Sequence, residues 1–237
     1  MTKRKRLRPF FSYYGSKWSI IKKYPHPIED TIIEPFAGSA SYALAYPNKK
    51  IILNDIDKNV FRIWKYLIRV SEKEILSLPD MSPDMSIHDL KEVCEEARIL
   101  IGYWLGRGRA RPCTKPGTWM KKEDYKSQVL YWGLGAKKRI SSQLQFIRHW
   151  KITNSSYCRL ENKRATYFID PPYYKGGKHY THHKINYHKL SLWCQTRAGQ
   201  AIVCENQHGN WLQFKALTQL QGTTKKTVEH IFHKITK

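Results

Sequence analysis

The chain has 237 residues, of which 41% are hydrophobic, so it can bury the core of one large domain and is not a disordered tail. Its 42 Lys and Arg residues outnumber its 19 Asp and Glu residues, and the formal net charge of +23 favours a polyanionic partner, nucleic acid first. Because no long apolar span or signal-like segment occurs, we expect no membrane partner and a cytoplasmic protein.

Two apolar segments on either side of a glycine turn begin the predicted fold. Residues 31–36 (TIIEPF) are typical of a buried strand, and the turn AGSAS and a helix-like YALAY follow. Residues 49–55 (KKIILND) form a second strand that ends in acid, before the helical NVFRIWKYLIRV. Strand, turn, helix and strand in this order predict a βαβ unit of a parallel sheet.

The stretch from about 71 to 164 does not show this order of strand, turn, helix and strand. Apolar residues form one helical stripe within 88–101 and another within 137–150, which predicts helices there. The segment 102–122 between them is basic, contains no acid and interleaves arginine with aromatic residues, so we favour nucleic-acid contact over a solvated connection. The candidate DNA-binding residues are Arg107, Arg109, Arg111, Lys115, Lys121 and Lys122.

The rest of the chain returns to the first pattern. Residues 165–170 (ATYFID) and 200–206 (QAIVCEN) are typical of strands, HKLSLWCQTR of a helix, and TVEHIFHK of a closing strand. We therefore predict an α/β fold with a Rossmann-like domain formed by 1–70 and 151–237, and an inserted, mostly helical and basic lobe at 71–150.

The spacing of the cysteine and histidine residues does not predict a metal site. The five cysteines are scattered without a CxxC pair, which favours reduced thiols. The histidines of HYTHHKINYH have no Cys, Asp or Glu ligands nearby, so we interpret them as solvated or phosphate-facing and expect no metal.

The first turn and the acid after it are a weak signal for a nucleotide. Gly38 lies where a strand gives way to a helix, and Asp55 follows Glu34 at the spacing of a ribose-binding acid. One glycine and one acid recur in many α/β proteins, so this pair alone leaves the ligand open.

The segment YFIDPPYYKGG is more specific. A strand ends at Asp170, and Pro171, Pro172 and Tyr173 follow. The Asp170 carboxylate and the Pro171 carbonyl could accept both N–H groups of an exocyclic amine such as N6 of adenine, and Tyr173 could stack on the base. We interpret Asp170, Pro171, Pro172 and Tyr173 as catalytic.

These segments resemble the Dam-type (amino-alpha class) DNA adenine-N6 methyltransferases over 10–66 and about 150–205. FFSYYGSK resembles the family's F-x-K-W-A-G-G-K, EPFAGSAS resembles E-P-F-x-G-x-G, and Asp170 to Tyr173 match the catalytic motif. The resemblance implies a Rossmann-like methyltransferase sheet with helices on both faces, and S-adenosylmethionine as cofactor. The cofactor-binding residues that it implies are Tyr13, Gly15, Lys17, Glu34, Pro35, Phe36, Gly38, Asp55, Ile56, Ser156 and Asp170.

The sequence departs from the family at three positions. Ala40 replaces the second glycine of the cofactor motif and Ser16 replaces a glycine of the N-terminal motif. Ser156 stands where the family often has an aspartate, and its hydroxyl would hold the cofactor adenine more weakly than a carboxylate.

The resemblance implies direct methyl transfer to adenine N6 in DNA, duplex or single-stranded, with base flipping and no covalent intermediate. From the small insert we expect a short or relaxed recognition site, and we expect no obligate protein partner. The alternatives are an RNA adenine methyltransferase, methylation of protein glutamine, and a catalytically silent nucleic-acid-binding relative.

Overall fold

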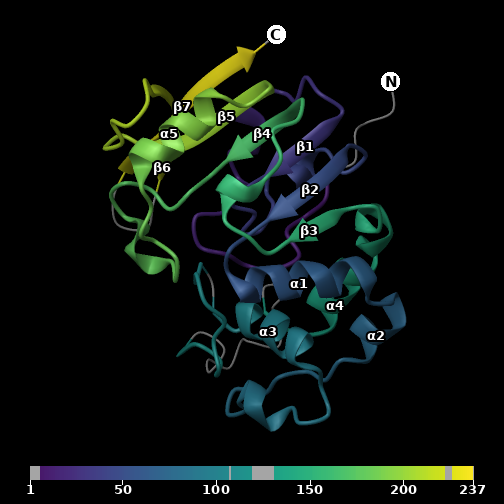
Figure 1. The fold of residues 1–237 in the computed structure, drawn as a ribbon. Coiled ribbons are helices and arrows are strands. Elements are labelled where there is room, and N and C mark those ends of the chain that lie inside the picture. The colour runs from purple at the N-terminus through teal and green to yellow at the C-terminus, as the bar shows by residue number, and fades with distance from the viewer. Residues whose placement is uncertain (1–5, 107, 119–130, 222–225, 237) are drawn as a thin grey trace.

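The computed structural model describes residues 6–106, 108–118, 131–221 and 226–236, and its centre is a seven-stranded sheet. The strand order is β3-β2-β1-β4-β5-β7-β6 (Figure 1). The strands are β1 (Thr31–Glu34), β2 (Lys50–Asn54), β3 (Lys151–Thr153), β4 (Ala165–Ile169), β5 (Gly199–Asn206), β6 (Lys215–Gln221) and β7 (Lys226–Thr236).

The first five strands are parallel, and β7 pairs antiparallel with both β5 and β6. The chain therefore moves outward from β1 through β2 to β3, then returns to the other side of β1 to form β4. Such a reversal of direction is the place where ligands bind at the carboxyl ends of the strands in doubly wound sheets.

Helices cover both faces of this sheet. The α-helices are α1 (Lys58–Arg69), α2 (Glu72–Ser77), α3 (Glu95–Trp104), α4 (Leu134–Ser141) and α5 (Tyr187–Gln195). Figure 1 shows α1 to α4 gathered below the β3 edge and α5 apart from them, near β5. The predicted Rossmann-like sheet with helices on both faces is confirmed.

Short 3-10 helices fill several connections: η1 (Ile21–Lys23), η2 (Ala43–Ala45), η3 (Ile87–Asp89), η6 (Leu144–Ile147), η7 (Tyr157–Arg159) and η8 (Gly177–His179).

Strand alternation explains why two layers of helices are needed. Ile32 of β1 packs into a cluster that also contains Trp64 of α1 and Leu100 of α3. Ile33, its neighbour in sequence, packs on the opposite face with Leu190 of α5. Because successive strand side chains point to opposite faces, each face buries its own apolar layer.

The helices of 71–150 share the first of these cores. Leu100, Trp104 and Ile140 are buried in the same cluster as Phe10 of the N-terminal segment. The Trp104 indole donates a hydrogen bond to the Phe10 carbonyl at 3.0 Å. Whether 71–150 acts as a separate lobe stays a prediction, but its helices directly support the segment that precedes β1.

Several element predictions were wrong in detail. The helix expected at YALAY is only the three-residue 3-10 helix η2, whose first residue, Ala43, donates its N–H to the Glu34 carboxylate at 2.7 Å. The stripe at 88–101 becomes η3 and then α3, which begins at Glu95, so Leu90 and Val93 precede the helix. The stripe at 137–150 is divided between α4 and η6.

Candidate functional site

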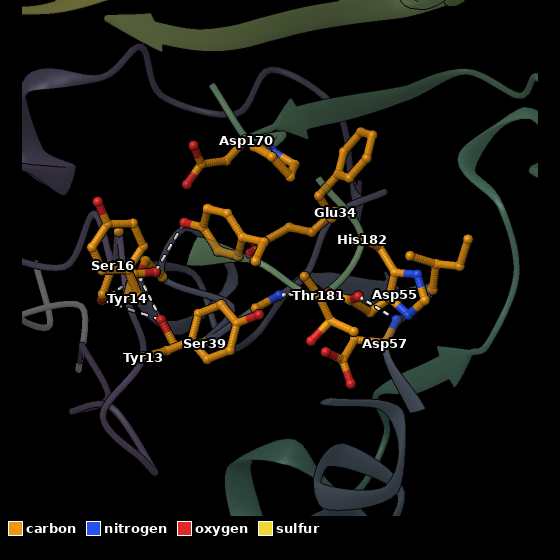
Figure 2. A pocket seen from close by; sticks show the side chains of 18 of the residues that line it. Tyr13, Tyr14, Ser16, Glu34, Ser39, Asp55, Asp57, Asp170, Thr181 and His182 are labelled. Atoms are coloured by element: carbon orange, nitrogen blue, oxygen red, sulfur yellow. Dashed lines mark hydrogen bonds between the residues drawn. The ribbon is translucent and has the colours of Figure 1, made fainter. Parts of the chain in front are cut away.

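A central cavity lies at the carboxyl ends of β1, β2 and β4. Figure 2 shows Asp170 on one side of it and Asp55 and Asp57 on another, so the acids that follow β4 and β2 meet around one space. The predicted residues that line it are Tyr13, Gly15, Glu34, Phe36, Gly38, Asp55, Ile56, Asp170 and Pro172.

A flanking cavity of about 330 Å³ adjoins the central one and shares Phe36 and Ile56 with it. Pro35 and Ser156, both predicted to bind the cofactor, line this second space. The Phe36 and Tyr157 rings lie 5.4 Å apart at its wall. Asp170 lines the central cavity and Ser156 the flanking one, and the two cavities share part of their walls.

The glycine turn between β1 and η2 is held from two sides. The Gly38 N–H donates to Asp55 Oδ2 at 3.0 Å, and the Trp64 indole of α1 donates to the Gly38 carbonyl at 2.8 Å. Gly38 has φ +45°, and a Cβ there would approach the Tyr13 ring to 3.0 Å. Only glycine combines this conformation with so close a neighbour.

Ala40 keeps a left-handed backbone although it has a side chain, with φ +51°. The family's glycine at this position would adopt that conformation freely. The substitution therefore leaves the turn in place and adds strain to it.

Asp55 holds the turn through its backbone contacts. Its second oxygen accepts the Asp57 N–H at 2.9 Å, while the Asp57 carboxylate caps α1 by accepting the Asn59 N–H at 2.8 Å. Burial raises the pKa of Asp55 to about 7, and the N–H donors of Gly38 and Asp57 oppose that rise.

Asp170, directly after β4, is paired with Lys17. The Lys17 ammonium lies 2.9 Å from Asp170 Oδ1 and also donates to the Gly15 carbonyl at 2.8 Å. Burial raises the pKa of Asp170 and the Lys17 charge opposes the rise. Burial alone would lower the pKa of Lys17, but Asp170 and Glu229 raise it above its usual value. Each charge of the pair therefore favours the charged form of the other.

In the segment after Asp170, Pro172 and Tyr174 are held by residues of α5 and β5. The Tyr187 hydroxyl donates to the Pro172 carbonyl at 2.7 Å, and the Tyr174 N–H donates to Glu205 Oε2 at 3.0 Å. The Trp211 indole donates to the same Glu205 oxygen at 2.8 Å. Within the described residues no donor is recorded for the Pro171 carbonyl.

Lys17 and Tyr173 line a different space from the one that the motifs predict. Both face a rear cavity of about 690 Å³, together with Glu229 and Asn206. The Lys17 ammonium lies 4.7 Å from the centre of the Tyr173 ring. The central and rear cavities share Tyr14, Gly15, Ser16 and Tyr180, so Asp170 and its lysine stand where the two spaces approach one another.

Tyr180 belongs to the histidine-rich segment and was not predicted as a site residue. Its hydroxyl donates to the Tyr14 carbonyl at 3.1 Å, and its ring centre lies 6.1 Å from that of Tyr13. Tyr13, Tyr14 and Tyr180 leave the central cavity about 60 Å³ of free space. Glu205 and Glu229 were also missed, because each is an isolated acid on a strand with no motif around it.

The basic loop borders the mouth of the central cavity. The Arg111 guanidinium donates to the Thr181 hydroxyl at 3.1 Å, and the Tyr14 N–H donates to the Arg109 carbonyl at 3.2 Å. Arg109, Arg111 and Lys115 are exposed. Arg107, Lys121 and Lys122 lie outside the described residues.

The described residues hold no group of three or more His, Cys, Asp or Glu side chains arranged for a metal ion. Among the same residues, no helix is both long and apolar enough to span a membrane.

Residues 13–98 match the model of the D12 class N6 adenine-specific DNA methyltransferases. The match contains Tyr13, the glycine turn and Asp55, and it confirms the predicted resemblance to the Dam-type family. No curated protein sequence matches the chain. Among solved structures, the chain is similar to a Haemophilus influenzae protein described as a methylase, with 11% identity, 85% of each chain covered and a TM-score of 0.31. That likeness is too distant to support more.

Proposed function

We propose that this chain, whose residues 13–98 match the D12 class N6 adenine-specific DNA methyltransferases, transfers a methyl group from S-adenosylmethionine to N6 of adenine in DNA. The observation that carries the proposal is the Asp170–Lys17 pair at the end of β4, 2.9 Å apart and beside the glycine turn.

The residues that line the two adjoining cavities are chemically suited to the cofactor. The buried Asp55 carboxylate suits a ribose hydroxyl, and the gap between Phe36 and Ile56 suits a planar adenine, with Ser156 beyond it.

S-adenosylmethionine, when bound, supplies an electrophilic methyl group. The chain's part is to position the acceptor amine, whose lone pair is delocalised into the adenine ring. The Asp170 carboxylate and the Pro171 carbonyl accept its two N–H bonds, which draws the nitrogen toward a tetrahedral geometry. Lys17 keeps Asp170 ionised, and an ionised acceptor makes the stronger hydrogen bond.

The acceptor base must leave the duplex to reach Asp170. The rear cavity, with Lys17 and Tyr173 in its wall, is wide enough to receive a flipped base. Exposed Arg109, Arg111 and Lys115 lie on the loop beside the cavity mouth and would hold the DNA backbone, which offsets the few kcal/mol that flipping costs. Such an enzyme acts in the cytoplasm, where DNA and cofactor are both present.

Transfer of tritiated methyl to unmethylated duplex DNA, single-stranded DNA and RNA tests the proposal. We expect label on DNA that is released as N6-methyladenine. Asp170→Asn should reduce transfer by at least a hundredfold, because the amide loses the charge that grips the amine and its partnership with Lys17.

Asp30→Asn is the matched control, because Asp30 also pairs with a lysine, Lys49, but is 93% exposed. Label on RNA alone would contradict the proposal that DNA is the substrate but not the assignment of the catalytic site. Near-normal rates in the Asp170 variant would overturn the catalytic assignment.

A further inference from the structure

Glu229 is a buried acid that neither the motifs nor the proposed chemistry uses. It lies on β7 opposite Asn206 of β5 and is 1% exposed. Burying a carboxylate is costly unless its oxygens have partners. A strand position that needs only a hydrophobic side chain would not retain an acid, so the partners of Glu229 indicate its role.

Two phenol hydroxyls converge on one oxygen of this acid. Tyr24 donates to Glu229 Oε1 at 2.6 Å, and Tyr173 donates to the same oxygen. Tyr24 is itself buried against Phe168 of β4, with ring centres 5.1 Å apart. Through this oxygen, Glu229 of β7 links the Tyr173 ring to Tyr24, which packs on the central strand β4.

The Tyr173 ring is half-buried, packs against the core cluster that contains Phe168 and Ile202, and faces the rear cavity with the Lys17 ammonium at 4.7 Å. These contacts hold the body of the ring, and the bond from its hydroxyl to a buried strand fixes its far end. Burial raises the pKa of Glu229, Lys17 lowers it and Asp170 raises it again.

We propose that Glu229 is a positioning residue for methyl transfer: by accepting the Tyr173 hydroxyl it fixes the plane of the ring on which the acceptor base stacks. This inference rests on the proposed function. Glu229 touches neither of the cavities assigned to the cofactor, so it acts on the acceptor side of the reaction. Misplacing an acceptor by about 1 Å can cost a hundredfold in rate.

A double-mutant cycle on the full-length protein tests the proposal, with kcat for duplex DNA and the Kd of S-adenosylmethionine as readouts. We expect Glu229→Ala and Tyr173→Phe each to lower kcat by roughly tenfold or more and to leave the cofactor Kd within about twofold. The double variant should lose little beyond either single variant, because both remove the same contact. Glu229→Gln should recover most of the rate, since its amide oxygen can accept the hydroxyl.

The matched control is a second tyrosine–glutamate pair on the surface, in which the Tyr66 hydroxyl donates to Glu74 at 3.1 Å. Tyr66→Phe and Glu74→Ala should leave kcat unchanged. Additive losses in the cycle, or a Gln variant as slow as the Ala variant, would overturn the positioning role while Asp170→Asn still reports on the proposed function. If Glu229→Ala does not fold, Glu229→Met, which fills a similar volume without an acceptor, takes its place in the cycle. A wild-type protein that transfers no methyl to any polymer overturns both proposals.

Discussion

Lys17 is the positive charge that acts on two acids, Asp170 and Glu229. Its ammonium lies 2.9 Å from Asp170, and Glu229 adds to the field that keeps Lys17 charged. Without Lys17, the effect of burial on Asp170 would meet much less opposition, and the pKa of Asp170 already lies above its usual value. The lysine thus decides at which pH the aspartate is available as an acceptor.

Replacing Lys17 with methionine should therefore move the acid limb of the pH–rate profile upward. Asp170 must be ionised, so activity falls as the pH drops through its pKa. Loss of the ammonium raises that pKa, and the fall begins at higher pH. The profile of kcat/KM measures this shift.

Lys49→Met removes a surface ion pair with Asp30 instead and should leave the limb in place, because exposed pairs are weak. A Lys17 variant whose acid limb stays where the wild-type limb lies would show that the lysine does not set the ionisation of Asp170.

At the scale of elements, the turn from β1 to η2 places the backbone against the cavity. Gly38→Ala should weaken binding of S-adenosylmethionine by tenfold or more, because a Cβ at 3.0 Å from the Tyr13 ring would displace that ring or the turn. Gly108→Ala is the control, since Gly108 also has positive φ, +60°, but meets nothing within 4 Å.

Both variants should lose stability by about 1–2 kcal/mol from the left-handed backbone, and only Gly38→Ala should lose cofactor affinity. Calorimetric titration and thermal melting separate the two effects. Equal loss of affinity in both variants would mean that backbone strain, not the contact with Tyr13, controls the cofactor turn.

The parallel strands and their terminal acids could be predicted, because each combines an apolar run with a recognisable ending. Glu34 ends β1, Asp55 and Asp170 follow β2 and β4, and all three line the central cavity. The strand β3 has three residues with exposed ends and β6 is half-polar, so neither has a clear hydrophobic period. Their positions depend on pairing with β2 and β7.

The missed site residues have the same explanation. Glu229 and Glu205 gain their roles from strand neighbours far away in sequence, and Tyr180 from the fold of a loop. The exclusion of Leu90 and Val93 from α3 follows from the Ser86 capping box, which starts the earlier turn η3. Local sequence does not contain these tertiary contacts.

At the scale of the whole molecule, the charge of +23 should dominate the affinity for DNA. Each phosphate contact releases a counterion, so we expect at least a tenfold loss of DNA affinity between 50 mM and 200 mM salt. The Kd of S-adenosylmethionine should change little over this range. Arg109→Ala and Arg111→Ala should each reduce the slope of log K against log salt by about one.

Fluorescence anisotropy with labelled duplex at several salt concentrations measures these slopes. A salt-independent affinity would contradict the role given to the charge. Sequencing of N6-methyladenine in DNA exposed to the protein would test the short or relaxed recognition site, which a single strict site of four or more bases would contradict.

The position of β7 between β5 and β6 also governs how the chain can assemble during synthesis. β6 is joined to the sheet only through β7 among the described pairings, and the outer edge of the buried strand β5 finds its partner there as well. Until residues 226–236 leave the ribosome, β5 therefore presents a row of unpaired N–H and C=O groups to other nascent chains. β7 covers this edge of β5 and brings Glu229 to Tyr173, so a growing chain gains this contact only when β5 is also protected from aggregation.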